Sequence, residues 1–345
     1  MRIDLAGWTR EATLGDHRAF LALFERADRL GFDGVWFAEF HFRAGLPYPS
    51  TLLLAAAIFA RTGRLRVGTS ILVLPLHHPL MLAEQIAQLD FQSGGRLDVG
   101  IGRGTDPATF AALGIEQTSA RDRFEQGFAI LRQALTHEQA SAGTGPWHFS
   151  DVPVGPRVVQ RPHPPLYVAG STPETLGFAV AHDLPLLLSL EPPEGRQLGI
   201  YRDLLARSGR PSALARSSLS RYVCIGATQA AAEARIDDLL PRIYQRRLGF
   251  AAARGVPADQ VPPLDRDQVL RDQVIHGDPD ACHAEIVRLK ATTGIGELRC
   301  VFNGNGVLDN ETALAGMELF AAEVLPALRR ERPTAQAAPE VSFTD

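Results

Sequence analysis

The chain has 345 residues, a length that suits either two average domains or one large α/β barrel. Hydrophobic residues make up 45% and charged residues 21%, as in a globular protein with a sizeable core. A net charge of −4 gives no sign of attraction to nucleic acid or to a membrane surface. Its start lacks the apolar core of a signal peptide, and no apolar run could span a bilayer, so we expect a cytoplasmic protein.

Apolar runs of strand length alternate with helical periodicity along the whole chain. We expect strands at residues 1–6, 34–38, 66–70, 97–101, 166–169, 186–190, 218–225 and 298–302. Helices are expected between them, the first capped by Asp16 and ended by Gly31. Residues 144–165 are rich in Gly and Pro and predict irregular chain, with short strands at 147–149 and 158–160.

About eight strand–helix units follow one another without a dividing linker, which favours a (β/α)8 TIM barrel over an open doubly wound sheet. We therefore expect one α/β domain at residues 1–331, with a loose insertion at about 255–272 and a disordered tail at 332–345. A barrel binds its ligand at the C-terminal ends of its strands. The candidate residues at those positions are Glu39, His41, Ser70, Arg103, Gly170, Ser171, Ser189 and Asn303.

The clearest ligand-binding pattern is the turn from the strand at 166–169 into a helix, Gly170-Ser-Thr-Pro-Glu-Thr175. Ser171 or Thr172 can cap this helix, and proline suits its first turn. The free N–H groups, the hydroxyls and the positive end of the helix dipole would hold a monophosphate, and Arg103 would balance its charge. An ordinary helix N-cap explains the same residues. Neither a Walker-type loop nor the dinucleotide glycine spacing is present.

Glu39 and His41 follow a predicted strand two residues apart, which places both side chains on one face. Together with His77 or His78 they could form a metal site. However, His77 and His78 begin a helix, and no further ligand has a fixed spacing to them, so we predict no metal. We expect instead that His41 belongs to a ligand site at a barrel strand end.

These residues sit within a longer set of motifs, and the chain resembles the bacterial luciferase-like flavin monooxygenases along nearly its whole length. The motifs are Gly31-Phe-Asp-Gly-Val-Trp36, Glu39-Phe-His-Phe42, Val67-Gly-Thr-Ser-Ile-Leu-Val-Leu-Pro75, His78-Pro79, Ala83-Glu84, Ser93-Gly-Gly-Arg96, Gly100-Ile-Gly-Arg-Gly104, Pro165-Leu-Tyr-Val-Ala-Gly-Ser171 and Gly277-Asp-Pro279. Together these motifs are specific to the superfamily, although no single motif is. The resemblance implies a TIM barrel with an inserted loop region, FMN as cofactor and a homodimer packed through the early helices.

The resemblance also implies roles for single residues. Ser70 and Ile71 match a pair, joined by a cis peptide, that lies behind the isoalloxazine ring of the flavin. Gly102 falls where the light-emitting luciferases carry a reactive cysteine, so no thiol is available there. The positions matched to the flavin phosphate and its surroundings are Arg103, Arg121, Ala169, Gly170, Ser171, Thr172 and Thr175.

One departure from the family pattern is at Phe40. The true luciferases have two adjacent histidines after the glutamate, of which the first is catalytic, and here that first position is Phe40. Because phenylalanine cannot move a proton, we do not expect light emission from a long-chain aldehyde. The wider oxidoreductase chemistry of the family does not depend on this residue.

The resemblance therefore implies a monooxygenase that uses O2 and reduced FMN, supplied by a separate flavin reductase, on a small organic substrate. His41 and Glu39 would handle protons or orient the substrate, although His41 could equally pack under the flavin. Three alternatives remain: an F420-dependent enzyme that transfers hydride, a non-catalytic flavin-binding protein, and a metal-dependent barrel hydrolase that uses Glu39, His41 and His77.

Overall fold

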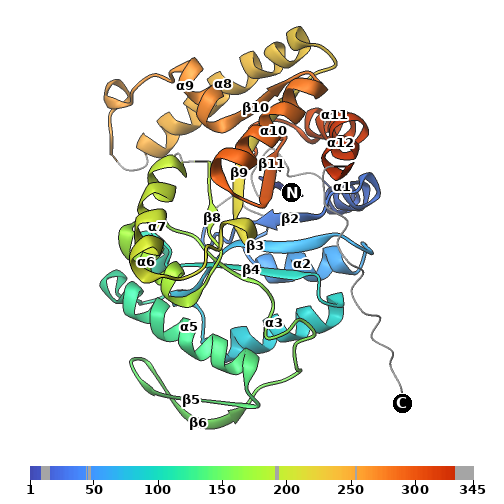
Figure 1. Ribbon diagram of the computed structural model, residues 1–345. Coiled ribbons are helices and arrows are strands. Elements are labelled where there is room, and N and C mark those ends of the chain that lie inside the picture. The colour runs from blue at the N-terminus through green and yellow to red at the C-terminus, as the bar shows by residue number, and fades with distance from the viewer. Residues whose placement is uncertain (9–15, 44, 46–47, 191–193, 253–254, 331–345) are drawn as a thin grey trace, which may run out of the picture.

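The computed structural model describes residues 1–8, 16–43, 45, 48–190, 194–252 and 255–330. The predicted disordered tail at 332–345 lies outside the described residues. Parallel strands around a central axis form the core of the fold (Figure 1). The barrel strands are β1 (Arg2–Ala6), β2 (Gly34–Phe37), β3 (Arg66–Val73), β4 (Leu97–Gly102), β7 (Leu166–Val168), β8 (Leu187–Leu188), β9 (Ser218–Ile225) and β11 (Glu297–Val301).

The strands follow the order expected of a (β/α)8 barrel. β1 pairs with β2 on one side, and the ladder continues through β3 and β4 to β7. On its other side β1 pairs with β11, which leads through β9 to β8. A single bridge between Val168 and Leu186 links β7 to the start of β8. The predicted TIM barrel is therefore confirmed, and the open doubly wound sheet is wrong.

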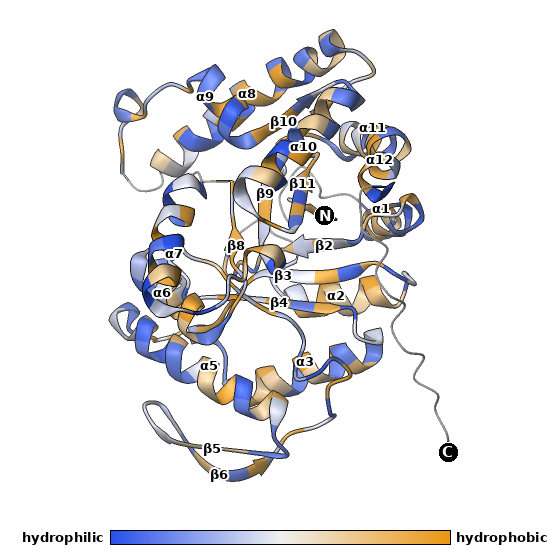
Figure 2. Cartoon of the chain, viewed as in Figure 1, coloured by the Kyte–Doolittle hydropathy of each residue, from blue (hydrophilic) through white to orange (hydrophobic). Residues whose placement is uncertain are grey.

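Helices cover the outside of the barrel (Figure 1). Asp16 accepts a hydrogen bond from the Arg18 N–H at the start of the first helix, and Gly31 ends it at a φ of 91°, as predicted. Hydrophobic and hydrophilic residues alternate along the helices (Figure 2), with the apolar side chains packed on the strands. The helices are α1 (His17–Leu30), α2 (Thr51–Phe59), α3 (Pro79–Ser93), α4 (Pro107–Ala112), α5 (Ala120–Thr136), α6 (Pro173–His182), α7 (Glu194–Ser208), α8 (Gln229–Ala252), α10 (Pro279–Thr293), α11 (Asn310–Leu319) and α12 (Leu325–Arg330). Across the described ranges, none of the helices has the length and apolar character needed to cross a membrane.

Some elements differ from the sequence-based expectation. The strand predicted at 158–160 does not form, because the N–H groups of Val159 and Gln160 donate to the buried carboxylate of Asp90 instead of to a neighbouring strand. Part of the region expected to be a loose insertion is helical. The strand predicted at 147–149 does form, as the start of β6 (Trp147–Pro153). The elements not predicted are its hairpin partner β5 (Gln139–Thr144), the helix α9 (Arg266–Gln273), and β10 (Val274–Gly277), which pairs with the second half of β9.

The lower interior of the barrel, at the N-terminal ends of the strands, is filled by a charged network. Arg2 contacts Asp98 at 2.7 Å and Asp4 at 2.8 Å, and Arg66 contacts Asp98 at 2.7 Å. The indole N–H of Trp36 donates to Asp4 at 2.6 Å. Because the carboxylates of Asp4 and Asp98 are fully buried, these partners satisfy charges that water cannot reach. The network closes the barrel from below and leaves the upper end for a ligand.

Candidate functional site

The residues singled out from the sequence meet at the upper, C-terminal end of the barrel. Glu39 and His41 follow β2, Ser70 and Ile71 lie within β3, and Arg103 follows β4. Three cavities of about 340, 190 and 200 Å³ open among them, and Ser70 lines all three. The predicted position of the site, at the strand ends of a barrel, is therefore where the structure brings the candidate residues together.

The start of α6 has the geometry of a phosphate cradle. The hydroxyl of Thr172 accepts a hydrogen bond from the Thr175 N–H at 3.4 Å and so caps the helix. Arg121 lies beside this turn, donating to the Glu174 carbonyl at 3.2 Å and to the Thr175 hydroxyl at 3.4 Å. Glycine is required at position 170, because a Cβ there would lie 2.5 Å from the Thr175 methyl group. Hydroxyls, a helix N-terminus and an arginine are the donors that fit a phosphate monoester.

Two arginines act on the carboxylate at the start of α6. Glu174 is exposed in the first turn of α6, and its pKa is lowered, first by its own backbone N–H and then by the Thr172 hydroxyl. The positive charges of Arg121 and Arg103 lower this pKa further. Arg103 is exposed and forms no hydrogen bond with any residue that the structure describes. An anion at the start of α6 would meet the same attraction as the Glu174 carboxylate does.

One wall of the site is formed by Ser70 and Ile71, whose peptide bond is cis, as the family resemblance implied. Gly102 leaves room for this wall, because a Cβ at that position would lie 2.2 Å from the Ile71 side chain. The cysteine of the light-emitting luciferases would therefore not fit here without moving Ile71. A cavity of about 200 Å³ runs from Gly170 and Ser171 to this wall, with Ala169 between them. Five of the residues predicted to bind the cofactor thus line one groove, namely Ser70, Ile71, Ala169, Gly170 and Ser171.

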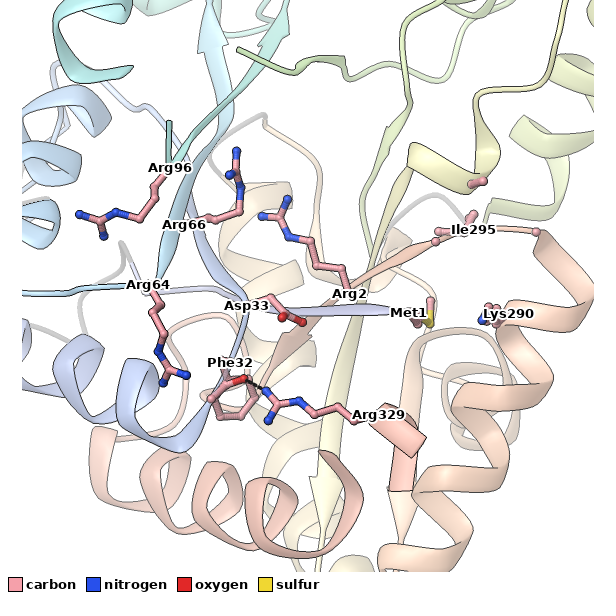
Figure 3. A pocket seen from close by; sticks show the side chains of 14 residues that line it. Met1, Arg2, Phe32, Asp33, Arg64, Arg66, Arg96, Lys290, Ile295 and Arg329 are labelled. Carbon is pink, nitrogen blue, oxygen red and sulfur yellow. Dashed lines mark hydrogen bonds between the residues drawn. The ribbon is translucent and has the colours of Figure 1, made fainter. Parts of the chain in front are cut away.

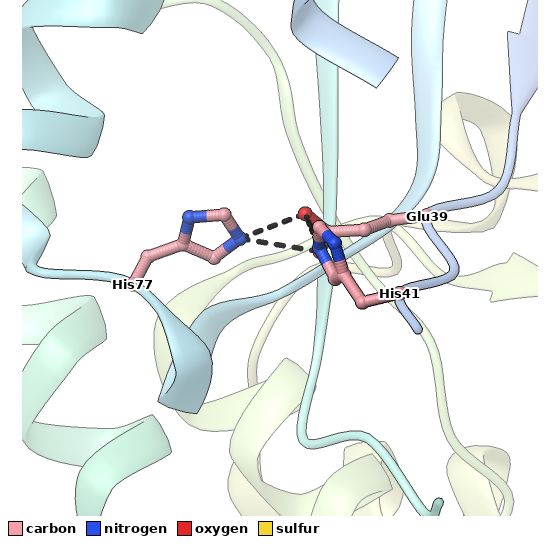
Figure 4. A group of neighbouring side chains, drawn as sticks. All are labelled: Glu39, His41 and His77. Carbon is pink, nitrogen blue, oxygen red and sulfur yellow. Dashed lines mark hydrogen bonds and ion pairs between the residues drawn. The ribbon is translucent and has the colours of Figure 1, made fainter. Parts of the chain in front are cut away.

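Glu39 is the centre of a hydrogen-bonded cluster beside this wall (Figure 4). Its Oε1 atom accepts from His41 Nε2 and from His77 Nε2, each at 2.9 Å. Its Oε2 atom accepts from the Val73 N–H at 2.6 Å. Sequence reasoning considered His77 only as a metal ligand, and the contact with Glu39 was missed because 38 residues separate them. The carboxylate therefore fixes two imidazole rings at once.

The cluster sets the protonation of its members. Although burial alone would raise it, the pKa of Glu39 is lowered to about 2, because the hydrogen bonds from His41, His77 and Val73 favour the carboxylate. The hydrogen bond to Glu39 raises the pKa of His41 above its usual value of 6.5. Because an ionised carboxylate can only accept, both histidines must present Nε2–H to it. Nδ1 of His41 is then the atom that can exchange a proton at the cavity of about 190 Å³ that His41 lines.

The same three side chains also satisfy a geometric criterion for metal binding, since one donor atom from each lies within 4.8 Å of the others. Their N–O distances of 2.9 Å are ordinary hydrogen-bond lengths, and one carboxylate oxygen is already bound to the Val73 N–H. Hydrogen bonding therefore accounts for the arrangement of Glu39, His41 and His77.

Arg299 is a site residue that sequence reasoning missed. It lies in β11, is only 2% exposed, and lines two of the three cavities. Its guanidinium donates to the Ser70 hydroxyl at 2.8 Å and to the Leu188 carbonyl. The available signal was an arginine within the apolar strand pattern Leu298-Arg-Cys-Val-Phe302. By contrast, Asn303 is buried and donates to the Gly7 carbonyl, which is a structural contact rather than a place in the cavities.

A further cavity of about 700 Å³ lies beside the starts of β1, β3 and β11, at the opposite end of the barrel. Figure 3 shows the side chains that line it. Many of its cations already serve the fold: Arg329 donates to the Gly31 carbonyl at the end of α1, and Arg96 donates to the Phe59, Ser93 and Leu65 carbonyls. Arg2 and Arg66 belong to the buried charged network. Its size does not make it the functional site, because ligands of barrel enzymes bind at the other end.

Known proteins resemble this chain along most of its length. The sequence profile of the luciferase-like monooxygenase family matches residues 3–296. The alkanal monooxygenase alpha chain of Photorhabdus laumondii is 27% identical over 331 residues, which are 89% of this chain and 90% of the relative. An uncharacterised protein of Sinorhizobium fredii is 36% identical over 162 residues, 47% of either chain. The oxygenase component of flavin-dependent trigonelline monooxygenase from Acinetobacter baylyi is 31% identical over 162 residues, which are 46% of this chain and 45% of that protein.

Solved structures show the same fold. The monooxygenase RslO1 of Streptomyces bottropensis superposes with a TM-score of 0.79 at 27% identity over 95% of this chain and all of that one. The 3,6-diketocamphane monooxygenase of Pseudomonas putida, solved with FMN, has a TM-score of 0.74 at 20% identity, covering 94% of this chain and 98% of that one. An F420-dependent secondary alcohol dehydrogenase has a TM-score of 0.70 at 17% identity, covering 95% of this chain and 99% of that one. Because the family profile matches most of its length, the chain belongs to the luciferase-like monooxygenase family.

Proposed function

We propose that this chain is a monooxygenase that binds reduced FMN and uses O2 to oxidise a small organic substrate. The observation that carries the proposal is the groove that joins the phosphate cradle at Ser171 to the wall at Ser70 and Ile71. In it, a positively charged helix start lies at one end and a flat, partly apolar wall at the other. These are the two features that a flavin mononucleotide needs from a protein.

The residues that would hold FMN follow from this geometry. Thr172, Thr175, Ser171 and Arg121 would bind the phosphate, and Arg103 would add charge from the end of β4. Ser70 and Ile71 would support the ring. Bound reduced FMN supplies the two electrons needed to activate O2, and the protein supplies position and charge. F420 is the second candidate cofactor. Its longer acidic tail calls for basic residues beyond the cradle. Of the cations in the described part of the chain, Arg121 and Arg103 are those that act on the Glu174 carboxylate at this end of the groove.

Glu39 and His41 would handle the proton of the reaction. Since Glu39 holds Nε2–H of His41, the ring cannot turn to offer that nitrogen to a ligand, and Nδ1 is the atom left to act. His77 holds the carboxylate from the other side and so positions both groups. Phe40, between Glu39 and His41 in the chain, lines two of the cavities as an apolar wall. Its place there favours substrate packing over proton transfer.

A separate flavin reductase would supply the electrons. The sequence pattern along residues 3–296 is that of the oxygenase family and leaves no room there for a nicotinamide-binding domain. The trigonelline relative is likewise described as the oxygenase component of its system. We therefore propose that this chain works with a partner that delivers FMNH2 in solution.

A homodimer is also proposed, packed through α2 and α3. Three large apolar side chains are exposed there, Leu53 at 75%, Met81 at 57% and Phe91 at 62%. α2, with the sequence Thr-Leu-Leu-Leu-Ala-Ala-Ala-Ile-Phe, is apolar on all sides, although only one side can face the barrel. A second copy of the chain would cover this surface.

The experiment that tests the cofactor compares FMN, riboflavin and F420. We expect the protein to bind FMN at least about tenfold more tightly than riboflavin, which lacks the phosphate, because a charge-assisted contact is worth about 1.5–3 kcal/mol. The Arg121→Gln variant should lose this preference for FMN, and riboflavin binding should not change. Arg132→Gln is the matched control, since Arg132 lies exposed on the same helix, away from the cradle.

Several results would contradict the proposal. Tighter retention of F420 than of FMN would favour the hydride-transfer alternative. Stoichiometric zinc in the purified protein would favour the metal-dependent hydrolase. If FMN binds but the protein with FMNH2 never consumes O2 faster than free FMNH2, with or without candidate substrates, the chain is a non-catalytic flavin-binding protein. In the active enzyme, His41→Ala should lower turnover about a hundredfold or more, the size of effect usual for a general acid or base.

A further inference from the structure

The cavity of about 340 Å³ has a character of its own and is called here the arginine cavity. It shares Ser70, Ser189 and Arg299 with the groove that reaches the phosphate cradle, and no residue of the cradle itself lines it. Its walls come from the ends of β1, β2, β9 and β11 and from α8, which crosses above them.

The charge of the arginine cavity is one-sided. Arg246, Arg247 and Arg299 line it, and none of the described residues in its wall is acidic. The neighbouring cavity at His41 differs, because Glu39 and Asp106 both line it. In that cavity Arg43 pairs with Asp106 and His41 with Glu39, so its charges are balanced. A negatively charged molecule that enters the site would therefore be drawn to the arginine cavity.

Two of these arginines are held by neutral groups. Arg299 donates to the Ser70 hydroxyl and the Leu188 carbonyl, and its buried Nε has no partner among the described residues. Its guanidinium stacks 5.6 Å from the centre of the Trp36 ring. Arg246 donates to two loop carbonyls, those of Gly304 and Asn305, and to the Tyr222 hydroxyl at 2.8 Å. None of these contacts is with a carboxylate.

Burial makes this lack of a counter-charge significant. Burial lowers the pKa of Arg299 to about 10, which still leaves it protonated at neutral pH. Buried charges in folded proteins are nearly always paired, since an unpaired one is costly. The acids nearest in the barrel, Asp4 and Glu297, are already bound to Arg2, Trp36 and Tyr167. Among the residues that the structure describes, no carboxylate pairs with Arg299, which leaves the cavity as the place for a counter-charge.

The rest of the wall sets the kind of molecule that would fit. Trp36, Phe40, Ile243 and Val301 offer apolar surface, and Ser220 offers a hydroxyl. A cavity of about 150 Å³ is enough for benzene, so 340 Å³ admits a single substituted ring or a short chain. The arginine cavity thus combines apolar surface with arginine side chains in its wall.

We propose that the arginine cavity is the substrate pocket and that it selects a small organic anion, a carboxylate or phenolate, whose charged group contacts Arg299 and Arg246. This inference rests on the proposed function, because the cavity acts as a substrate pocket only if the flavin lies in the adjacent groove. Arg299 and Arg246 could instead stabilise a negative charge on the reduced flavin ring. The experiment separates these two sources.

The test uses three pairs of probes that share shape and differ in charge: benzoate and benzamide, phenylacetate and phenylacetamide, butyrate and butyramide. Binding is measured by calorimetry with the full chain, both free and loaded with FMN. We expect at least one acid to bind about tenfold or more tightly than its amide, and the preference to fall as salt is added. Arg299→Met and Arg246→Met should each remove the preference without changing amide binding. Two variants are used because replacing the buried Arg299 could disturb folding.

Arg242→Gln is the matched control and should keep the preference for the acid. Arg242 lies one turn before Arg246 on α8, is exposed, and pairs with Asp238 on the surface. If none of the three acids binds better than its amide, the proposal is wrong even when FMN binds as expected. If the preference is present in protein that does not bind FMN, the anion pocket stands and the cofactor assignment fails. If Arg299→Met alters only the affinity for reduced FMN relative to oxidised FMN, the flavin is the anion and the substrate proposal is overturned.

Discussion

Replacement of Glu39 by Gln tests the centre of the site without needing a substrate. The side chain accepts three N–H groups, two from histidine rings and one from the backbone of Val73. An amide keeps the shape but places an NH2 group against one of these donors and removes the negative charge. We therefore expect Glu39→Gln to destabilise the fold, since the neutral amide loses the charge-assisted hydrogen bonds that the carboxylate accepts from His41, His77 and Val73.

The size of the effect follows from the pKa of Glu39. A pKa of about 2 in the folded chain, compared with 4.5 for an unperturbed glutamate, corresponds to about 3 kcal/mol of stability. Because this pKa is lowered, the contribution is complete above pH 4.5 and is lost as the pH falls toward 2. The pKa of His41 is raised, so its share is present below pH 6.5 and is lost as the pH rises through its folded-state pKa.

The free energy of unfolding should therefore differ most between wild type and Glu39→Gln at about pH 4.5 to 6.5, where both contributions are present. The difference should be smaller at lower and at higher pH. Urea unfolding of both proteins at a series of pH values measures it. Glu318→Gln is the control, because its partner Arg26 and Glu318 itself are more than 40% exposed, and such pairs contribute about 1 kcal/mol or less. A difference that stays below about 1 kcal/mol, or that does not change with pH, would refute the reasoning.

Two further predictions concern the cradle and the dimer. Gly170→Ala should weaken FMN binding about tenfold or more, because the added Cβ would push Thr175 out of the cradle. Gly177→Ala in α6 is the control, since a Cβ there meets nothing within 4 Å. It should stabilise the fold by about 0.5–1 kcal/mol. Equal FMN affinity in the two variants would show that Thr175 has no part in binding. Leu53→Glu should convert the dimer to a monomer in analytical ultracentrifugation, whereas the control Val287→Glu on α10 should not. If the wild type is already monomeric, the proposed dimer is wrong.

The parts of the fold that could be predicted are those determined by neighbouring residues. The Asp16 cap, the Gly31 stop and the Thr172 cap each depend on groups within a few positions of one another, so the local sequence contains the information. The barrel strands were recognised because strands buried on both faces are nearly continuous apolar runs. β10 was missed because its four residues, Val-Ile-His-Gly, are too short to show a pattern and follow a region rich in proline.

The position of the site was predicted from the sequence, whereas the hydrogen bonds between its distant residues were not. The cradle could be recognised because one turn of chain contains most of it. The contact of His77 with Glu39 and that of Arg299 with Ser70 join residues 38 and 229 positions apart, and only the closed barrel brings them together. A single sequence shows that an arginine stands in an apolar strand, but it does not show what that arginine meets.

The arginines of the barrel interior illustrate why this distinction matters. Arg2 and Arg299 lie near the same Trp36 ring, at 5.8 and 5.6 Å from its centre, yet only Arg2 contacts carboxylates. Below the ring, each positive charge has its counter-charge within the protein, as expected of a structural layer. Beside the cavity, the fold holds Arg299 in place with neutral oxygens and leaves its charge without a partner among the described residues. This contrast between paired and unpaired buried charges, within the described part of the chain, is the argument for the proposed anion site beside Arg299.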